Sequence, residues 1–197
     1  MFRYTLSLFL VLLASATLLA QADLNALNDY FEKARQDWGV PCMAIAIAKD
    51  GEVMLSKGYG TLGVDNNAPA DGNTVFAIAS NTKAFISTAI GMLVEEGKLE
   101  WDDPVQKHLP YFELYAPYVT AHTTVRDLLC HRVGLGTFSG DVIWYKNEQS
   151  AEEVIRRTRH VPQAYEYRAG YGYSNLMFIT AGEVIRAASG KPWDEFI

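Results

Sequence analysis

A serine and a lysine three positions apart, Ser80 and Lys83, could together carry out acyl transfer. Residues at this spacing on a helix lie on one face, so the hydroxyl and the amine are expected to be neighbours. The N-terminus of a helix favours negative charge near Ser80, and burial among Ala84, Ile86 and Ala89 disfavours a protonated Lys83. A neutral lysine can take the serine proton. We therefore predict that Ser80 is a nucleophile and Lys83 its base.

The Ser-x-x-Lys pattern is short enough to arise by chance, and a serine helix cap with a surface lysine is the alternative interpretation. Two features strengthen the catalytic interpretation. The match is the only one in the chain, and it begins a segment, 80–99, that is apolar nearly all round in its first turns. Such a helix is expected to be central in the fold.

A second group of candidate residues is Tyr173-Ser174-Asn175. A phenol can carry a proton between a nucleophile and a leaving group, and an asparagine amide can both donate to and accept from a substrate amide. An aromatic turn with an asparagine cap is the alternative. Tyr145-Lys146-Asn147 has the same Tyr-x-Asn pattern, but a polar segment follows it, whereas an apolar helix is predicted after Asn175. We therefore favour Tyr173 and Asn175 as site residues.

The elements that must position these residues are mostly helices. A β-hairpin is predicted from the apolar segment 43–48, the turn Asp50-Gly51 and the returning segment 53–60, with a loop over 61–74. Helical spacing predicts further elements at 23–38, 80–99, 124–130, 150–159 and 176–189. Ser150 and Glu153 are expected to form a capping box on the helix over 150–159. This order of elements predicts an α+β fold.

Two strands are too few for a stable sheet, so the remaining strands are expected downstream of Ile197. The segment 193–197 also has the pattern of the first turn of another helix. We expect the chain to be truncated.

The ordered motifs Ser80-Asn81-Thr82-Lys83, 128–135 and Tyr173-Ser174-Asn175 resemble the superfamily of class C β-lactamases and penicillin-binding proteins. That superfamily also includes D-alanyl-D-alanine carboxypeptidases, esterases and amide hydrolases. The resemblance covers about 24–197. It implies a β-lactamase/transpeptidase-like fold, an antiparallel sheet flanked by helices plus a helical subdomain, incomplete here because the C-terminal strands are absent.

The resemblance also implies roles for single residues. Ser80 would be the acylated nucleophile, Lys83 the base, Tyr173 the proton carrier to the leaving group and Asn175 a contact to the substrate amide. The Ser80 backbone N–H would form half of the oxyanion hole. His131 matches a histidine that the family carries, and we interpret it as structural.

The family's third motif, Lys/His-x-Gly on an edge strand, is absent. Lys49-Asp50-Gly51 has this pattern, but it precedes Ser80 and fits a hairpin turn, so we reject it. In the family that strand supplies the second oxyanion N–H. We therefore expect 23–197 alone to be inactive and poorly folded. The segment 168–172 departs from the family's common Pro-Gly turn, which favours a β-lactamase-related hydrolase slightly over a true β-lactamase.

Composition restricts the other possibilities. Residues 1–22 carry Arg3, an apolar stretch and a small-x-small site before Asp23, which predicts a cleaved signal peptide, with an uncleaved anchor as the alternative. The domain would then be 23–197, periplasmic or secreted, with no stable membrane insertion. The net charge of −6 without a basic stripe argues against nucleic acid. Cys42 and Cys130 are expected to be buried free thiols rather than a disulfide, and they form no zinc motif with the histidines.

These features together predict a serine hydrolase that acts through an acyl-enzyme on a small-molecule or peptide substrate, an amide or an ester, without a cofactor or metal. A penicillin-binding or sensor protein that is acylated at Ser80 without turnover is the alternative. A helical scaffold with chance motifs is a third hypothesis, which the order of the motifs disfavours.

Overall fold

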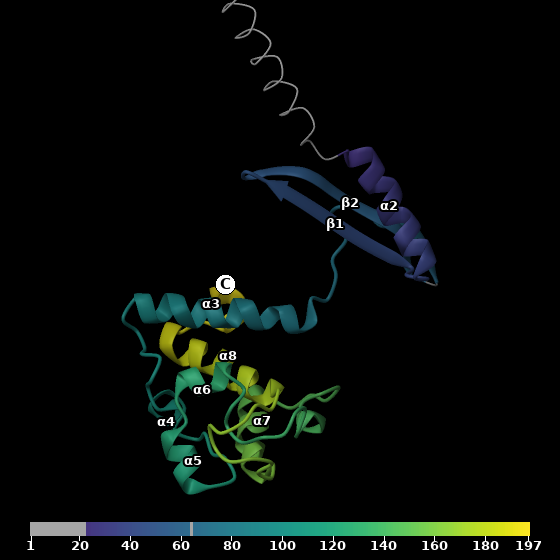
Figure 1. Cartoon of the computed structure of the whole chain (residues 1–197). Helices are drawn as coiled ribbons and strands as arrows, with labels where there is room; N and C mark the ends of the chain where they lie inside the picture. The colour runs from purple at the N-terminus through teal and green to yellow at the C-terminus, as the bar shows by residue number, and fades with distance from the viewer. Residues whose placement is uncertain (1–22, 64) are drawn as a thin grey trace, which may run out of the picture. The chain divides into compact units, whose positions relative to one another are not determined.

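The computed structural model describes residues 23–63 and 65–197, and the chain divides into two compact units, Met1–Ala77 and Ile78–Ile197 (Figure 1). The signal peptide predicted at 1–22 lies outside the described residues. Within the described ranges, no helix is both long and apolar enough to cross a membrane.

The first unit contains the predicted helix and hairpin. Helix α2, Leu24–Asp37, begins at Asp23, whose carboxylate caps it. Strands β1, Cys42–Lys49, and β2, Glu52–Gly63, pair antiparallel, and α2 lies along them (Figure 1). Asp50 and Gly51 both have positive φ angles, 53° and 82°, as a type I′ hairpin turn requires. The hairpin is confirmed, and Lys49-Asp50-Gly51 is part of its turn.

The loop predicted over 61–74 is wrong in its first part. Strand β2 continues to Gly63, and β3, Asn66–Pro69, pairs with it to give a three-stranded sheet in the order β1-β2-β3. Asparagine and proline are poor strand formers, so composition argued for a loop. Backbone pairing along the extension of β2 outweighs that preference.

The second unit is helical. Its elements are η1 Ala79–Asn81, α3 Thr82–Glu95, α4 Val105–His108, α5 Pro117–His122, α6 Val125–Leu129, η2 Asp141–Ile143, α7 Ala151–Arg157, η3 Thr158–His160, α8 Asn175–Ser189 and α9 Trp193–Phe196. Helices α3, α6 and α7 all pack against α8 (Figure 1). The core between them includes Ile90, Leu128, Ile155, Leu176 and Ile185, all fully buried. An α+β fold is therefore confirmed.

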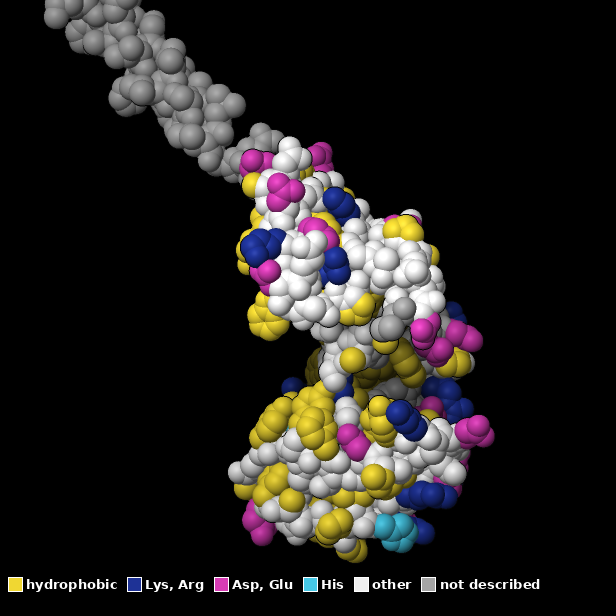
Figure 2. All heavy atoms as spheres, turned by 90° about the vertical axis from the view of Figure 1, so that its right-hand side faces the viewer, with side chains coloured by type: hydrophobic (Ala, Val, Ile, Leu, Met, Phe, Trp, Pro, Cys, Tyr) yellow, Lys and Arg dark blue, Asp and Glu magenta, His cyan; other side chains and the backbone are white. Residues whose placement is uncertain are grey.

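Helix α3 differs from its prediction in two respects. It begins at Thr82, so Ser80 lies in the short turn η1 that precedes it. Its buried side chains form one face, whereas Phe85 and Met92 are 49% and 46% exposed. Hydrophobic side chains gather over the α3 side of the helical unit in Figure 2. Within the described residues of the helical unit, one face of α3 is therefore buried against α8, and the apolar side chains Phe85 and Met92 lie on the other face.

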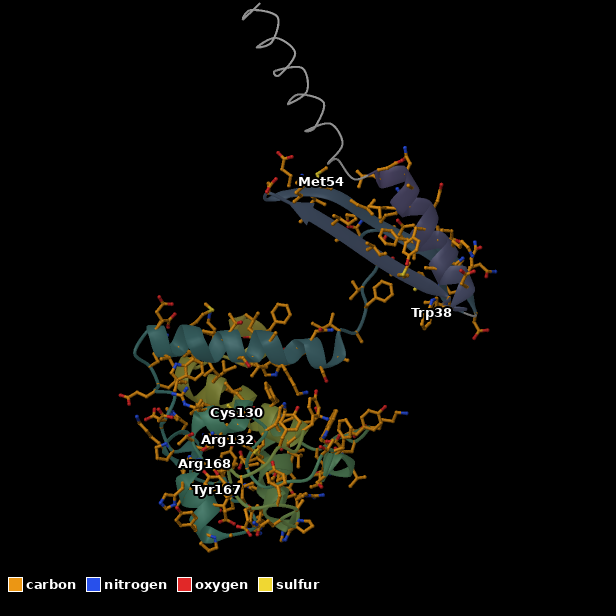
Figure 3. The ribbon with its side chains drawn as sticks, viewed as in Figure 1. Trp38, Met54, Cys130, Arg132, Tyr167 and Arg168 are labelled. Carbon is orange, nitrogen blue, oxygen red and sulfur yellow. The ribbon has the colours of Figure 1, made fainter. Side chains whose placement is uncertain are left out.

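The cysteines are both free. Cys42 is half-buried, but Cys130, the residue after α6, is exposed (Figure 3). The expectation of burial is therefore wrong for Cys130. Its neighbour Leu128 is fully buried and Leu129 packs partly against the core, whereas Cys130 lies at the C-terminal end of α6 on its exposed side.

A buried aspartate, Asp127 in α6, ties together the segments around the core. Its carboxylate accepts hydrogen bonds from Arg132 Nε at 2.8 Å and Arg168 Nη2 at 2.5 Å. It also accepts from Tyr167 Oη at 3.0 Å and from the Thr124 backbone N–H at 3.0 Å. Arg132, Tyr167 and Arg168 lie close together below α6 in Figure 3. Asp127 therefore joins α6 to the segment that leads into α8.

The ionic state of Asp127 follows from these contacts. Burial by itself would raise the pKa of Asp127, but the hydrogen bonds from Arg168, Thr124 and Arg132 outweigh burial and hold that pKa well below its ordinary range. The contacts therefore stabilise the fold above the pKa of an unfolded aspartate, about 3.9, and are lost as the pH falls towards the folded value.

We expect Asp127→Asn to lower the free energy of unfolding by about 3 kcal/mol at neutral pH, because it leaves two guanidinium groups without a carboxylate. This value is at the lower end of the usual cost of removing one partner of a buried ion pair, because water reaches the Arg132 and Arg168 side chains, which are 37% and 40% exposed. Urea unfolding of the longest natural polypeptide that contains these residues measures the loss. Asp102→Asn is the matched control, because it breaks an exposed pair with Arg126 and should leave the urea midpoint unchanged. Equal effects of the two variants would contradict a special role for Asp127.

Candidate active site

Ser80 and Lys83 lie together at the start of α3. Ser80 is exposed, and Lys83, half-buried, points its Nζ to within 3.4 Å of Ser80 Oγ. The residue before the serine, Ala79, has a φ of +46°, a conformation that residues with a Cβ atom seldom adopt. This turn sets the backbone direction at Ser80, which lies before α3 with its side chain exposed.

Tyr173 makes a shorter contact with the serine hydroxyl than Lys83 does. Its Oη donates to Ser80 Oγ at 2.5 Å, and the two residues are 93 positions apart in the chain. Tyr145, the alternative, is 59% exposed, and its ring packs edge-on against Trp144. The structure thus brings Tyr173 to Ser80.

Asn175, the first residue of α8, links the two helices. Lys83 Nζ donates to Asn175 Oδ1 at 2.7 Å. Asn175 Nδ2 in turn donates to Asp141 Oδ2 at 2.9 Å, and Trp144 Nε1 donates to Asp141 Oδ1 at 3.0 Å. The Asp141 carboxylate can only accept, so it turns the amide nitrogen of Asn175 towards itself and the amide oxygen towards Lys83.

Asp141 is a site residue that the sequence analysis missed. It lies 34 positions before Asn175, in a segment with no recognisable motif. No local pattern marks it, because its role depends only on where the turn η2 lies in the folded unit.

The amine of Lys83 also acts on Tyr173. Its Nζ lies 4.7 Å from the centre of the Tyr173 ring and 5.2 Å from that of Phe178. Burial would raise the pKa of Tyr173, but its interactions with Lys83 and Ser80 outweigh burial and lower that pKa. The Tyr173 phenol therefore ionises more readily than the phenol of a free tyrosine.

Backbone contacts fix the Tyr173 segment. The Tyr173 N–H donates to Thr137 Oγ1 at 3.2 Å, and its carbonyl accepts from the Phe138 N–H at 2.8 Å. Next to it, Gly172 approaches so closely that a Cβ atom there would lie 1.9 Å from the carbonyl oxygen of Leu135. His131, predicted to be structural, is buried and contacts the same segment.

A pocket of about 420 Å³ opens beside Ser80, Lys83 and Asn175. Its other walls are largely apolar and are formed by Ile86, Trp144, Phe178, Ile179 and Trp193. The polar atoms lie together where the pocket meets Ser80. Such a site can hold an apolar group while a carbonyl lies near the hydroxyl.

Comparison with known proteins places this geometry in a family. The family model described as Beta-lactamase matches residues 27–197. The chain belongs to this family. Its fold is the β-lactamase/transpeptidase fold, in which serine hydrolases are common, and the resemblance stated from the motifs is confirmed.

Individual relatives agree with this assignment. The unguisins hydrolase of Aspergillus violaceofuscus is 32% identical over 180 residues, which cover 86% of this chain and 32% of the relative. Protein flp of Staphylococcus aureus is 31% identical over 173 residues, covering 87% of this chain and 34% of that protein.

Solved structures are similar as well. The octameric penicillin-binding protein homologue from Pyrococcus abyssi has a TM-score of 0.74 and 28% identity, with 89% of this chain and 41% of that one covered. The D-amino acid amidase of Ochrobactrum anthropi has a TM-score of 0.73 and 31% identity, covering 88% and 48%. The chain thus spans about a third of these curated relatives and under half of these solved structures.

We expect Asp141→Ala to lower the free energy of unfolding by about 1–3 kcal/mol, because Asn175 Nδ2 and Trp144 Nε1 each lose their acceptor. Urea unfolding of the longest natural polypeptide that contains these residues measures the change. Val142→Ala is the control, since this neighbour in η2 is 89% exposed and should leave stability unchanged. If Asp141→Ala unfolds at the same urea concentration as Val142→Ala, the carboxylate does not hold Asn175.

Proposed function

We propose that this chain belongs to a serine hydrolase that acts through an acyl-enzyme on a small amide, peptide or ester. The observation that carries the proposal is the contact of Tyr173 Oη with Ser80 Oγ at 2.5 Å, with Lys83 bound between Ser80 and Asn175. A hydroxyl, a phenol with a lowered pKa and an amine in mutual contact form an activated nucleophile.

In the proposed reaction, Ser80 Oγ bonds to the substrate carbonyl carbon while its proton passes to the pair formed by Tyr173 and Lys83. Tyr173 is the nearer acceptor once ionised, and the amine of Lys83 stabilises its phenolate. The phenol then returns the proton to the leaving nitrogen or oxygen as the bond to that atom breaks. Water hydrolyses the resulting ester and frees Ser80.

Asn175 is proposed to contact the substrate amide. Its Oδ1 is taken by Lys83 and one hydrogen of Nδ2 by Asp141, which leaves the second hydrogen free to bind a substrate carbonyl. The apolar pocket beside it favours substrates with an aliphatic or aromatic group next to the scissile bond. Relatives named a hydrolase and a D-amino acid amidase support cleavage of amides.

The second candidate function is acylation without turnover, as in a penicillin-binding or sensor protein. Similarity to a protein named a penicillin-binding protein homologue favours it. The two functions share the attack by Ser80 and differ in whether water reaches the acyl-enzyme.

Labelling with a fluorescent penicillin tests the function. The protein used is the longest natural polypeptide that contains these residues, with 23–197 alone beside it. We expect a label on Ser80 that decays as the acyl-enzyme hydrolyses, and no label on Ser80→Ala. A lasting label supports the second function. Turnover of a p-nitrophenyl ester without any penicillin label supports an esterase, whereas turnover of nitrocefin supports hydrolysis of a β-lactam amide. Modification or turnover that survives Ser80→Ala refutes the assignment of Ser80 as the nucleophile. Ser80-dependent turnover by 23–197 alone refutes the expectation that those residues by themselves are inactive.

The phenol is tested separately. We expect Tyr173→Phe to slow acylation of Ser80 by about 10²–10⁴-fold, because the proton loses its nearest acceptor. Stopped-flow fluorescence with the same penicillin, or ester turnover, gives the rate. Tyr145→Phe alters the other Tyr-x-Asn sequence and should react like wild type. A Tyr173→Phe variant as fast as Tyr145→Phe would show that Lys83 alone removes the serine proton.

A further inference from the structure

His131 contacts the segment that carries Tyr173 in three ways. Its carbonyl oxygen accepts from the Gly172 N–H at 2.9 Å, and its ring Nδ1 accepts from the Ser174 N–H at 3.0 Å. Its ring also stacks on the Tyr173 ring, with centroids 4.6 Å apart and planes 25° from parallel. One residue therefore holds the residues on both sides of Tyr173 and one face of the phenol.

The backbone of His131 is unusual in a way that makes these contacts possible. Its φ is +57°, in the left-handed region that asparagine and glycine tolerate better than most residues. This conformation turns the chain after α6, and it lets the carbonyl and the ring of the same residue face the Tyr173 segment. Tyr165 Oη donates to the same carbonyl at 2.9 Å and holds it in place.

The contact with Ser174 fixes the state of the ring. A backbone N–H can only donate, so Nδ1 is unprotonated and the ring proton is on Nε2. Burial, helped by the charge of Lys83, lowers the pKa of His131 and favours this neutral form. A protonated ring would carry a hydrogen on Nδ1 and would lose the bond to Ser174.

The other groups that face His131 do not favour the protonated form of its imidazole. They are Lys83 from α3, Phe178 from α8, and Tyr165, Tyr171 and Tyr173 from the segment before α8. None of them is a carboxylate that would favour the imidazolium. Arg132, the next residue in the chain, pairs with Asp127 instead.

We propose that His131 is a positioning residue for Tyr173, holding the phenol against Ser80 only while its imidazole is neutral and protonated on Nε2. This inference rests on the proposed function of Ser80 and Tyr173. Protonation of His131 removes the acceptor for the Ser174 N–H and places a positive charge against the Tyr173 ring. Acylation of Ser80 then slows as the pH falls through the pKa of His131.

A merely structural histidine would behave differently. A side chain that only filled space could be replaced by a leucine without effect on the reaction once the protein had folded. His131 instead supplies an acceptor to the Ser174 N–H, which leucine lacks and which the amide oxygen of an asparagine can restore. The informative substitutions are therefore His131→Leu and His131→Asn. Asparagine also accepts the positive φ and does not titrate.

The test is the pH profile of Ser80 acylation by a fluorescent penicillin or a p-nitrophenyl ester. We expect His131→Leu to be slower than wild type by about tenfold or more at the alkaline plateau, and His131→Asn to keep most of the plateau rate. Wild type is expected to lose activity on the acid side through both His131 and the pair that accepts the serine proton, and His131→Asn to lose only the part of that acid limb that His131 contributes. His160→Asn replaces an exposed histidine of the same unit and should keep the wild-type profile.

Nuclear magnetic resonance of nitrogen-labelled histidine provides a readout that does not need catalysis. We expect an unprotonated Nδ1 at neutral pH, and a Ser174 amide signal that shifts as His131 titrates. A protonated Nδ1 overturns the proposal. So does a wild-type protein that is acylated at Ser80 with the same plateau rate and pH profile as His131→Leu. A wild type in which Ser80 is never acylated at any pH refutes the proposed function instead, and leaves the tautomer measurement to judge the contact.

Discussion

The packing of α3 against α8 is the constraint on which the candidate site depends. It brings Lys83 and Asn175, 92 positions apart, to 2.7 Å, and it places Tyr173 against Ser80. The core between these helices is fully buried, so their register is costly to change. The polar atoms at the start of both helices are therefore fixed by apolar contacts deeper in the unit.

Around this packing, each polar group of the site has a partner that orients it. Asp141 sets the direction of the Asn175 amide, the amide oxygen receives Lys83, and Lys83 lowers the pKa of Tyr173. A chain of this kind orients each group through its neighbour, so that removing one member disturbs the next. The site is organised before any substrate is present, as electrostatic catalysis requires.

The loops are held by a different kind of contact. Asp127 joins α6 to Arg132 and Arg168, and His131 then reaches from the end of α6 to both neighbours of Tyr173. Irregular segments have few internal hydrogen bonds of their own. Asp127 in α6 and His131 just after that helix supply them here, which gives the phenol a defined position although it lies outside any helix.

The sequence by itself determined the features that depend on near neighbours. The hairpin turn at Asp50-Gly51, the helix closed by Gly190 and the two motifs at Ser80 and Tyr173 all follow from short spacings. Only the tertiary structure decided that β3 pairs with β2, which face of α3 is buried within the helical unit, and that Asp141 and His131 contact site residues. Those outcomes depend on packing between segments that lie far apart in the chain, and no local pattern of residue types encodes such distances.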